Sequence, residues 1–293
     1  MTAVLQGEQA ARSPAGWDVR SLDRLDDYRQ CERLQEAVWG RDDVAGVPLL
    51  DLMTARENGG VVLGAFSGEG RLMGFVYSFP GIHAGSRLKQ CSVLLGVHPA
   101  FRGLGVGVAL KRAQGEATLA LGMDLITWTF DPLLSLNAHL NIARLGGVAR
   151  EYRVNLYDSG NGLNSGLDTD RLVVEWWLRR SAYHDPRAPH RAPRRGLPPA
   201  NAMVNEVGAD PVTGLPRVRR VELDRDSDCV LVQVPADVHA VKRHDLDLAR
   251  HWRASTRAVL QEYLGRGYVA VDYLLPGCIG ELPCYLLRRR VSR

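Results

Sequence analysis

The segment that most constrains the fold is a strand-like apolar run followed by three closely spaced glycines and a helical pattern. Residues 91–97 read Cys-Ser-Val-Leu-Leu-Gly-Val, which predicts a strand buried on both faces. After a turn come Gly103, Gly105 and Gly107, and apolar residues then recur at helical spacing over residues 106–121. The segment therefore predicts a strand, a tight turn of bare backbone and the start of a helix.

A turn of this kind favours the binding of an anion. The first N–H groups of a helix have no partner within the helix, and they lie at the positive end of its dipole. Glycines leave that backbone open to a pyrophosphate, and Arg102 adds a full positive charge beside it. The glycines alone leave one alternative open, which is a tight turn that only connects a strand to a helix.

Two other phosphate-binding motifs do not fit this spacing. A dinucleotide fingerprint, G-x-G-x-x-G, would need glycine where Val108 or Leu110 stands. A phosphate loop, G-x-x-x-x-G-K-[ST], needs glycine before its lysine and Ser or Thr after it, whereas Lys111 lies between Leu110 and Arg112. Both motifs are excluded.

Composition limits the partners. The 293 residues are 45% hydrophobic and 24% charged, which is typical of a globular protein with one large domain or two smaller ones. A net charge of +4 suits a small anionic ligand and not a nucleic acid. Five cysteines without C-x-x-C spacing indicate neither a metal site nor a disulfide framework. No apolar run approaches about 18 residues, and no export signal is seen, so we expect no membrane contact and a cytoplasmic location.

The composition changes along the chain in four steps. Residues 1–16 are polar, and we expect them to be loosely held. Residues 17–180 alternate strand-like and helix-like runs and predict one domain. Residues 181–200 are rich in Pro and Arg, which cannot sustain a helix and predict a linker. Residues 201–293 return to ordered patterning and predict a smaller C-terminal subdomain.

The order of the expected elements predicts the fold class. Over residues 17–180 the order is β-α-α-β-β-β-α-β-α-β-β, which favours an α+β fold with a mixed, mostly antiparallel sheet flanked by helices. Within residues 201–293, a strand, a helix and two further strands predict an α+β appendage. We expect this appendage to pack on the sheet beside the acceptor site, or to join two copies of the chain as a homodimer.

The spacing R-x-x-G-x-G, formed by Arg102, Gly105 and Gly107 after Val-His-Pro-Ala-Phe, resembles the coenzyme A motif of GNAT-type N-acyltransferases. The element order over residues 17–180 is similar to that of the same family. The resemblance implies acetyl-CoA or succinyl-CoA as the co-substrate, with no metal. It also implies an asparagine, here Asn137, that contacts the pantetheine arm. The implied contacts to the pyrophosphate and upper pantetheine come from Val97, Arg102, Gly103, Leu104, Gly105, Val106 and Gly107.

The implied reaction is direct transfer of an acyl group to the amine of a small molecule or amino acid. The amine must lose a proton, and the candidates that would take it are Asp131, His98, His139 or a water relay. Many relatives carry a tyrosine that protonates the leaving thiolate, but Asn141 stands in the corresponding stretch. Water, Tyr152 or Tyr157 would then supply the proton. The missing tyrosine leaves a second function open, a catalytically inactive sensor or scaffold that binds coenzyme A.

Two further stretches, residues 127–133 and 169–176, resemble a GNAT subgroup linked to N-succinylamino acid metabolism. This resemblance implies a succinyl donor, whose carboxylate would pair with an arginine. Arg144, Arg153 and Arg171 are the candidates.

Overall fold

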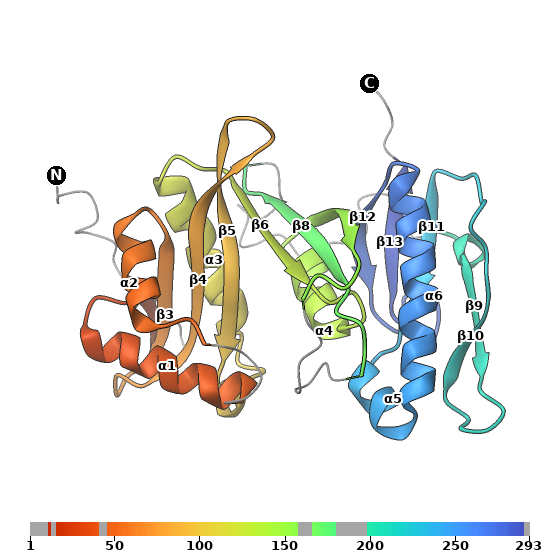
Figure 1. The fold of residues 1–293 in the computed structure, drawn as a ribbon, viewed down its shortest axis with the longest axis horizontal. Coiled ribbons are helices and arrows are strands. Elements are labelled where there is room, and N and C mark those ends of the chain that lie inside the picture. The colour runs from red at the N-terminus through yellow and green to blue at the C-terminus, as the bar shows by residue number, and fades with distance from the viewer. Residues whose placement is uncertain (1–10, 13–15, 41–45, 158–165, 180–197, 290–293) are drawn as a thin grey trace. The chain divides into compact units, whose positions relative to one another are not determined.

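The computed structural model describes most of the chain in two compact units (Figure 1). The described residues are 11–12, 16–40, 46–157, 166–179 and 198–289. The first unit is Met1–Ile126 and the second is Thr127–Arg293. Most of the expected linker at 181–200, and most of the expected loose start at 1–16, lies outside the described residues. Those expected domain boundaries stay predictions.

The first unit contains five strands in chain order, each antiparallel to its neighbours. They are β1 (Ala11–Arg12), β2 (Trp17–Ser21), β3 (Val61–Ser67), β4 (Leu72–His83) and β5 (Arg87–Val97). Alternation along β3 sends successive side chains into two different cores. Val62 and Phe66 belong to one core, and Leu63 and Ala65 to the other.

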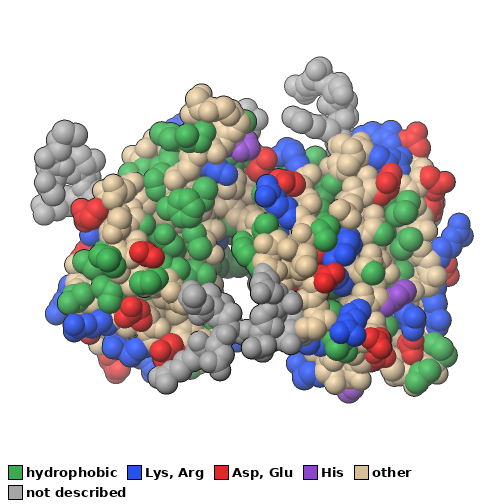
Figure 2. All heavy atoms as spheres, viewed as in Figure 1, with side chains coloured by type: hydrophobic (Ala, Val, Ile, Leu, Met, Phe, Trp, Pro, Cys, Tyr) green, Lys and Arg blue, Asp and Glu red, His purple; other side chains and the backbone are tan. Residues whose placement is uncertain are grey.

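Three long helices cover the two faces of these strands. Helices α1 (Leu25–Trp39) and α2 (Leu49–Glu57) supply side chains to one core, and α3 (Val106–Ala120) supplies the other. A short 3-10 turn, η1 (Pro99–Phe101), joins β5 to the glycines that precede α3. On the face drawn in Figure 2, acidic, basic and apolar side chains are interspersed over α1 and α2.

Strand β5 differs from the strand expected at residues 91–97. Its faces meet both cores, but most of its side chains are half-buried, so the expectation of burial on both faces was wrong. The strand also carries a bulge, because Tyr77 pairs with Leu94 while Ser78 pairs with Ser92. Val93 is therefore the extra residue, and it is 47% exposed.

The second unit holds a strand sheet of order β8-β7-β12-β13-β11, which is antiparallel throughout. Strand β6 (Leu125–Phe130) leads into this unit, and β9 and β10 form a separate hairpin. The remaining bounds are α4 (Ser135–Ala138), η2 (His139–Arg144), β7 (Val148–Arg153), β8 (Arg171–Trp177), η4 (Ala200–Ala202), β9 (Asn205–Ala209), β10 (Pro216–Val221), β11 (Cys229–Gln233), α5 (Val238–His244), α6 (Leu246–Gly265), β12 (Tyr268–Leu274) and β13 (Cys284–Arg289).

The C-terminal elements extend the same sheet as β7 and β8. Ala270 of β12 pairs with Ala149 of β7, and one core contains residues from both. Trp252 and Tyr263 of α6 are fully buried in that core. The expected α+β class, a mostly antiparallel sheet flanked by helices with further C-terminal elements, is confirmed. None of the helices in the described ranges is long and apolar enough to cross a membrane.

Candidate functional site

The turn between β5 and α3 has the bare backbone that the sequence predicts. Gly103 and Gly105 adopt φ angles of +80° and +81°, which side chains of L-residues rarely tolerate. Gly105 is the N-cap residue of α3 and offers no side chain to cap it. The first N–H groups of a 15-residue helix, at Val106 and Gly107, therefore open onto this turn.

The space in front of the helix is also open. A Cβ atom built on Gly103 or Gly105 would find no atom within 4 Å. Leu104 between them is 58% exposed, whereas Val106 is buried and anchors the first turn of the helix in the core. The arrangement is a backbone cradle that fits a diphosphate. The unpaired N–H groups and the positive end of the helix dipole face the open space beside Gly103 and Gly105.

Arg102 lies beside the end of β5. Its Nε donates a hydrogen bond to the carbonyl oxygen of Val97 at 3.4 Å, which holds the cationic side chain at the rim of the turn. His98 caps the η1 turn, because its Nδ1 accepts a hydrogen bond from the N–H of Ala100 at 3.2 Å. The structure thus brings the predicted coenzyme A residues from Val97 to Gly107 together at one strand end, while His98 has a structural contact.

Lys111 of α3 has a position that the helical pattern did not predict. The apolar stripe of this helix runs through Val106, Leu110 and Ala113, so the sequence predicts Lys111 and Gln114 on the opposite, polar face. In the structure both are buried against β5. The Lys111 Nζ donates to Ser92 Oγ at 2.8 Å and to Gln114 Oε1 at 3.0 Å. Burial lowers the pKa of Lys111 from 10.5 to about 7, because desolvation penalises its charged form.

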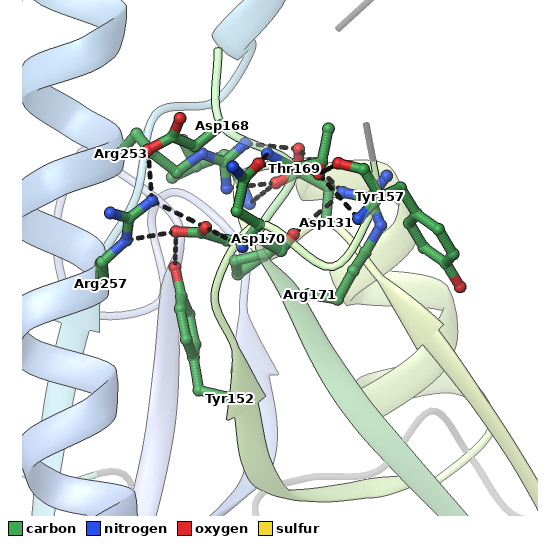
Figure 3. A network of polar contacts seen from close by, with 12 residues as sticks. Asp131, Tyr152, Tyr157, Asp168, Thr169, Asp170, Arg171, Arg253 and Arg257 are labelled. Atoms are coloured by element: carbon green, nitrogen blue, oxygen red, sulfur yellow. Dashed lines mark hydrogen bonds and ion pairs between the residues drawn. The ribbon is translucent and has the colours of Figure 1, made fainter. Parts of the chain in front are cut away.

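Asp131 follows β6 and belongs to a network of buried charges in the second unit (Figure 3). Arg253 of α6 donates to both carboxylate oxygens of Asp131, at 2.8 and 2.5 Å. The same carboxylate accepts the N–H of Leu133 at 2.8 Å. Arg253 and Asp131 are only 3% and 5% exposed. Both carboxylate oxygens of Asp131 are therefore already engaged by N–H donors, and these contacts favour a structural role for Asp131.

A second carboxylate, Asp170, lies in the same network. Arg257, one turn after Arg253 on α6, donates to both oxygens of Asp170 at 2.8 Å, and Tyr152 donates to it at 2.6 Å. Burial alone would raise the pKa of Asp170, but the hydrogen bonds from Arg257 and Tyr152 outweigh it and hold this pKa below its ordinary value. The pKa of Tyr152 is raised by burial and by Asp170, which makes Tyr152 a poor proton donor.

Arg171 connects the two carboxylates to the surface. It lies 3.8 Å from Asp131 Oδ2, donates to the carbonyl oxygen of Asp170 at 2.9 Å and faces the Tyr157 ring at 5.2 Å. Burial lowers the pKa of Arg171, and the nearby Asp131 opposes this shift. Among the three arginines predicted for a succinyl carboxylate, Arg171 is half-buried, whereas Arg144 and Arg153 are exposed.

The other predicted site residues follow β6 on a helix that changes type. Asn137 is exposed on α4, and His139 and Asn141 lie on the π-helical turn η2. The wider turn is seen in the hydrogen bond from the N–H of Leu145 to the carbonyl oxygen of Leu140 at 2.9 Å. His139 is half-buried and Asn141 is 5% exposed, so the two residues do not share one environment.

Tyr157 differs from Tyr152 in being exposed. Its hydroxyl lies 3.3 Å from Thr129 Oγ1, near the end of β6. The described residues contain no group of three His, Cys, Asp or Glu side chains that could hold a metal ion.

The sequence analysis did not identify Arg253 and Arg257 as site residues, although Arg253 falls within the apolar stripe of the helix at residues 246–263. A charge in such a stripe signals a buried ion pair.

Comparison with known proteins gave structural likenesses only. No family model matches the sequence, and no curated protein matches it. Similar solved structures include an acetyltransferase of the GNAT family from Streptococcus pneumoniae, at 14% identity over 55% of this chain and 99% of that chain, with a TM-score of 0.46. A second is the ribosomal-protein-S18-alanine N-acetyltransferase from Escherichia coli, at 12% identity over 55% and 94%, with a TM-score of 0.43. A third is the NatC complex bound to Gag peptide and CoA, at 14% identity over 55% and 98%, with a TM-score of 0.46.

Proposed function

We propose that the chain is a GNAT-type N-acyltransferase that uses an acyl-coenzyme A. The observation that carries the proposal is the uncapped start of α3, with open space in front of Gly103 and Gly105. Acyl-coenzyme A supplies an activated thioester and a diphosphate. The backbone from Gly103 to Gly107 would hold the diphosphate, and Arg102 would add a charged contact at its rim.

The remaining contacts are proposed by position. The end of β5 at Val97 would align the pantetheine arm, and Asn137, exposed on α4, would contact it. An amine attacks the thioester carbonyl only in its neutral form, so a base or water must remove its proton. His139 and Asn141 are the catalytic candidates that remain. Asp131, the third, would act through Arg253 to hold the end of β6 in place.

Tyr157 is the better of the two tyrosines for protonating the leaving thiolate, because it is exposed, whereas Tyr152 donates to Asp170. If it has this role, Tyr157→Phe should lower kcat at least tenfold while coenzyme A affinity is unchanged. Thr129→Val is the matched control, since it removes the neighbouring hydroxyl and keeps the tyrosine. An unchanged kcat in Tyr157→Phe would assign the proton to water.

The reaction is tested by incubating the purified protein with acetyl-CoA or succinyl-CoA and a panel of amines and amino acids, while thiol release is followed. Release that depends on an amine supports the enzyme, and the better donor distinguishes acetyl from succinyl transfer. The burial of Asp131 under Arg253 motivates the alternative of a sensor or scaffold. Tight binding of coenzyme A in calorimetry, without release for any pair, would favour that alternative.

A further inference from the structure

A cation–π contact lies beside the backbone cradle between β5 and α3. The guanidinium carbon of Arg71 lies 5.2 Å from the centroid of the Phe101 ring. Phe101 ends the η1 turn and is followed directly by Arg102 and Gly103. Because consecutive Cα atoms are about 3.8 Å apart, the Cα atoms of Phe101 and Gly103 are at most about 7.6 Å apart. The contact therefore places a second arginine, from a different part of the first unit, next to the cradle.

The backbone that carries Arg71 is fixed by the closed turn between β3 and β4. The N–H of Arg71 donates to Ser67 Oγ at 3.2 Å, and its carbonyl oxygen accepts the N–H of Ser67 at 2.9 Å. The next residue, Leu72, donates its N–H to Gln30 Oε1 of α1 at 2.8 Å. The turn and α1 thus hold the start of the Arg71 side chain in one place.

The Phe101 ring is held as well. Phe101 is half-buried and packs against the core that contains Met73 and Val106. The ring of His98 lies on it at a centroid distance of 5.6 Å and an angle of 51°. The N–H of His98 donates to the carbonyl oxygen of Met73 at 2.9 Å, which joins the η1 turn to β4. The ring is therefore a fixed support for the Arg71 guanidinium.

The charge of Arg71 is available to an anion. Arg71 is exposed, and within the described ranges it forms no ion pair with a carboxylate, including that of Glu69 in the same turn. In that part of the chain Arg102 makes one side-chain hydrogen bond, from its Nε to the carbonyl oxygen of Val97. Two arginines that lack a carboxylate partner among these residues thus lie at the entrance to the cradle.

Coenzyme A carries a third phosphate group, which is separate from its diphosphate. This phosphate is on the 3′ oxygen of the ribose, and the diphosphate is attached to the 5′ carbon of the same ribose. A molecule whose diphosphate lies on the cradle therefore brings its 3′-phosphate to the surroundings of this turn. A phosphate monoester has a charge of about −1.5 to −2 at pH 7, and it accepts charge-assisted hydrogen bonds from the planar guanidinium group of arginine.

We propose that Arg71 binds the 3′-phosphate of coenzyme A and so makes the chain select coenzyme A over 3′-dephospho-coenzyme A. The inference rests on the proposed function, because it needs the diphosphate on the cradle. Phe101 is a positioning residue, since its ring supports the guanidinium. The 3′-phosphate keeps all its bonds during acyl transfer, so Arg71 acts on the affinity for coenzyme A and not on the chemical step.

The first test is calorimetric titration of the wild type with coenzyme A and with 3′-dephospho-coenzyme A, which differ only in this phosphate. Kd should be at least about tenfold lower for coenzyme A, as expected for hydrogen bonds between charged groups. Equal Kd values for the two ligands would overturn the inference and leave the diphosphate cradle intact. Absence of binding for both ligands would refute the proposed function itself.

The second test uses variants. Arg71→Met keeps an apolar stem on Phe101 and removes the charge, so it should raise the Kd of coenzyme A about tenfold and leave that of 3′-dephospho-coenzyme A unchanged. Arg71→Lys, which keeps a point charge without the planar fork, should retain part of the preference.

Arg112→Met is the matched control, because Arg112 is an exposed arginine further along α3. It should keep the full preference for coenzyme A. Thermal denaturation checks that each variant is folded. A preference that is kept in folded Arg71→Met, or lost in Arg112→Met instead, would overturn the assignment to Arg71.

Discussion

Replacing Gly107 by Asp should weaken coenzyme A binding roughly a hundredfold without weakening the fold. Gly107 is the second residue of α3, and a Cβ there would meet Val97 Cγ2 at 3.7 Å, an ordinary contact. A carboxylate at this position interacts favourably with the helix dipole and should stabilise the fold by about 0.3–1 kcal/mol. Towards a bound diphosphate the same charge is repulsive by about 4 kcal/mol per pair of unit charges at about 4 Å and an effective dielectric constant of about 20.

Solvent and salt reduce that repulsion, so we expect a loss of about 3 kcal/mol, which is roughly a hundredfold weaker Kd. Gly107→Asn is the matched control, because it has the same shape without the charge. Calorimetry with coenzyme A measures the affinity, and thermal denaturation measures stability. If Gly107→Asp binds coenzyme A as tightly as Gly107→Asn, with both variants folded, the diphosphate does not sit at this helix end and the proposed function loses its basis.

Three further substitutions test the interior. Arg253→Met leaves Asp131 buried without its partner and should cost about 3–5 kcal/mol in urea unfolding; a loss below about 1 kcal/mol would contradict the buried pair. Lys111→Met should stabilise the fold near pH 7. Between pH 7 and 10 the unfolded lysine holds a proton that the folded one has lost, so the wild type should gain up to about 1.4 kcal/mol per pH unit relative to this variant, and a constant difference would refute the lowered pKa. Gly105→Ala should cost about 1–2 kcal/mol in thermal denaturation because of its positive φ, whereas Gly107→Ala should not destabilise; equal effects would contradict the turn geometry.

The strands and long helices could be predicted from periodicity because each has a face that packs in a core. The same pattern misplaced Lys111 and Gln114. With Gly107 and Thr118 they form a stripe at helical spacing, which is polar and yet buried except at the glycine. The side chain of Lys111 donates to Ser92, which lies beside the bulge in β5. No pattern within the helix reveals a partner that lies elsewhere in the chain.

The candidate site was predictable where it depends on backbone, and less so where it depends on distant side chains. Positive φ at Gly103 and Gly105 follows from local sequence, since glycine is the residue that adopts it without strain. The sequence predicted Asp131 as a candidate base just past the end of a strand. It is instead covered by Arg253, and a separation of 122 residues hides this pairing from any local motif.

The same separation bears on how the chain matures during its synthesis. Asp131 is translated long before Arg253, and 122 residues require about 6–24 seconds at about 5–20 residues per second. Throughout that interval the nascent β6 carries an acidic end that cannot enter an apolar interior. The second unit therefore has to wait for α6 to leave the ribosome, whereas the first unit, complete by Ile126, can form while translation continues.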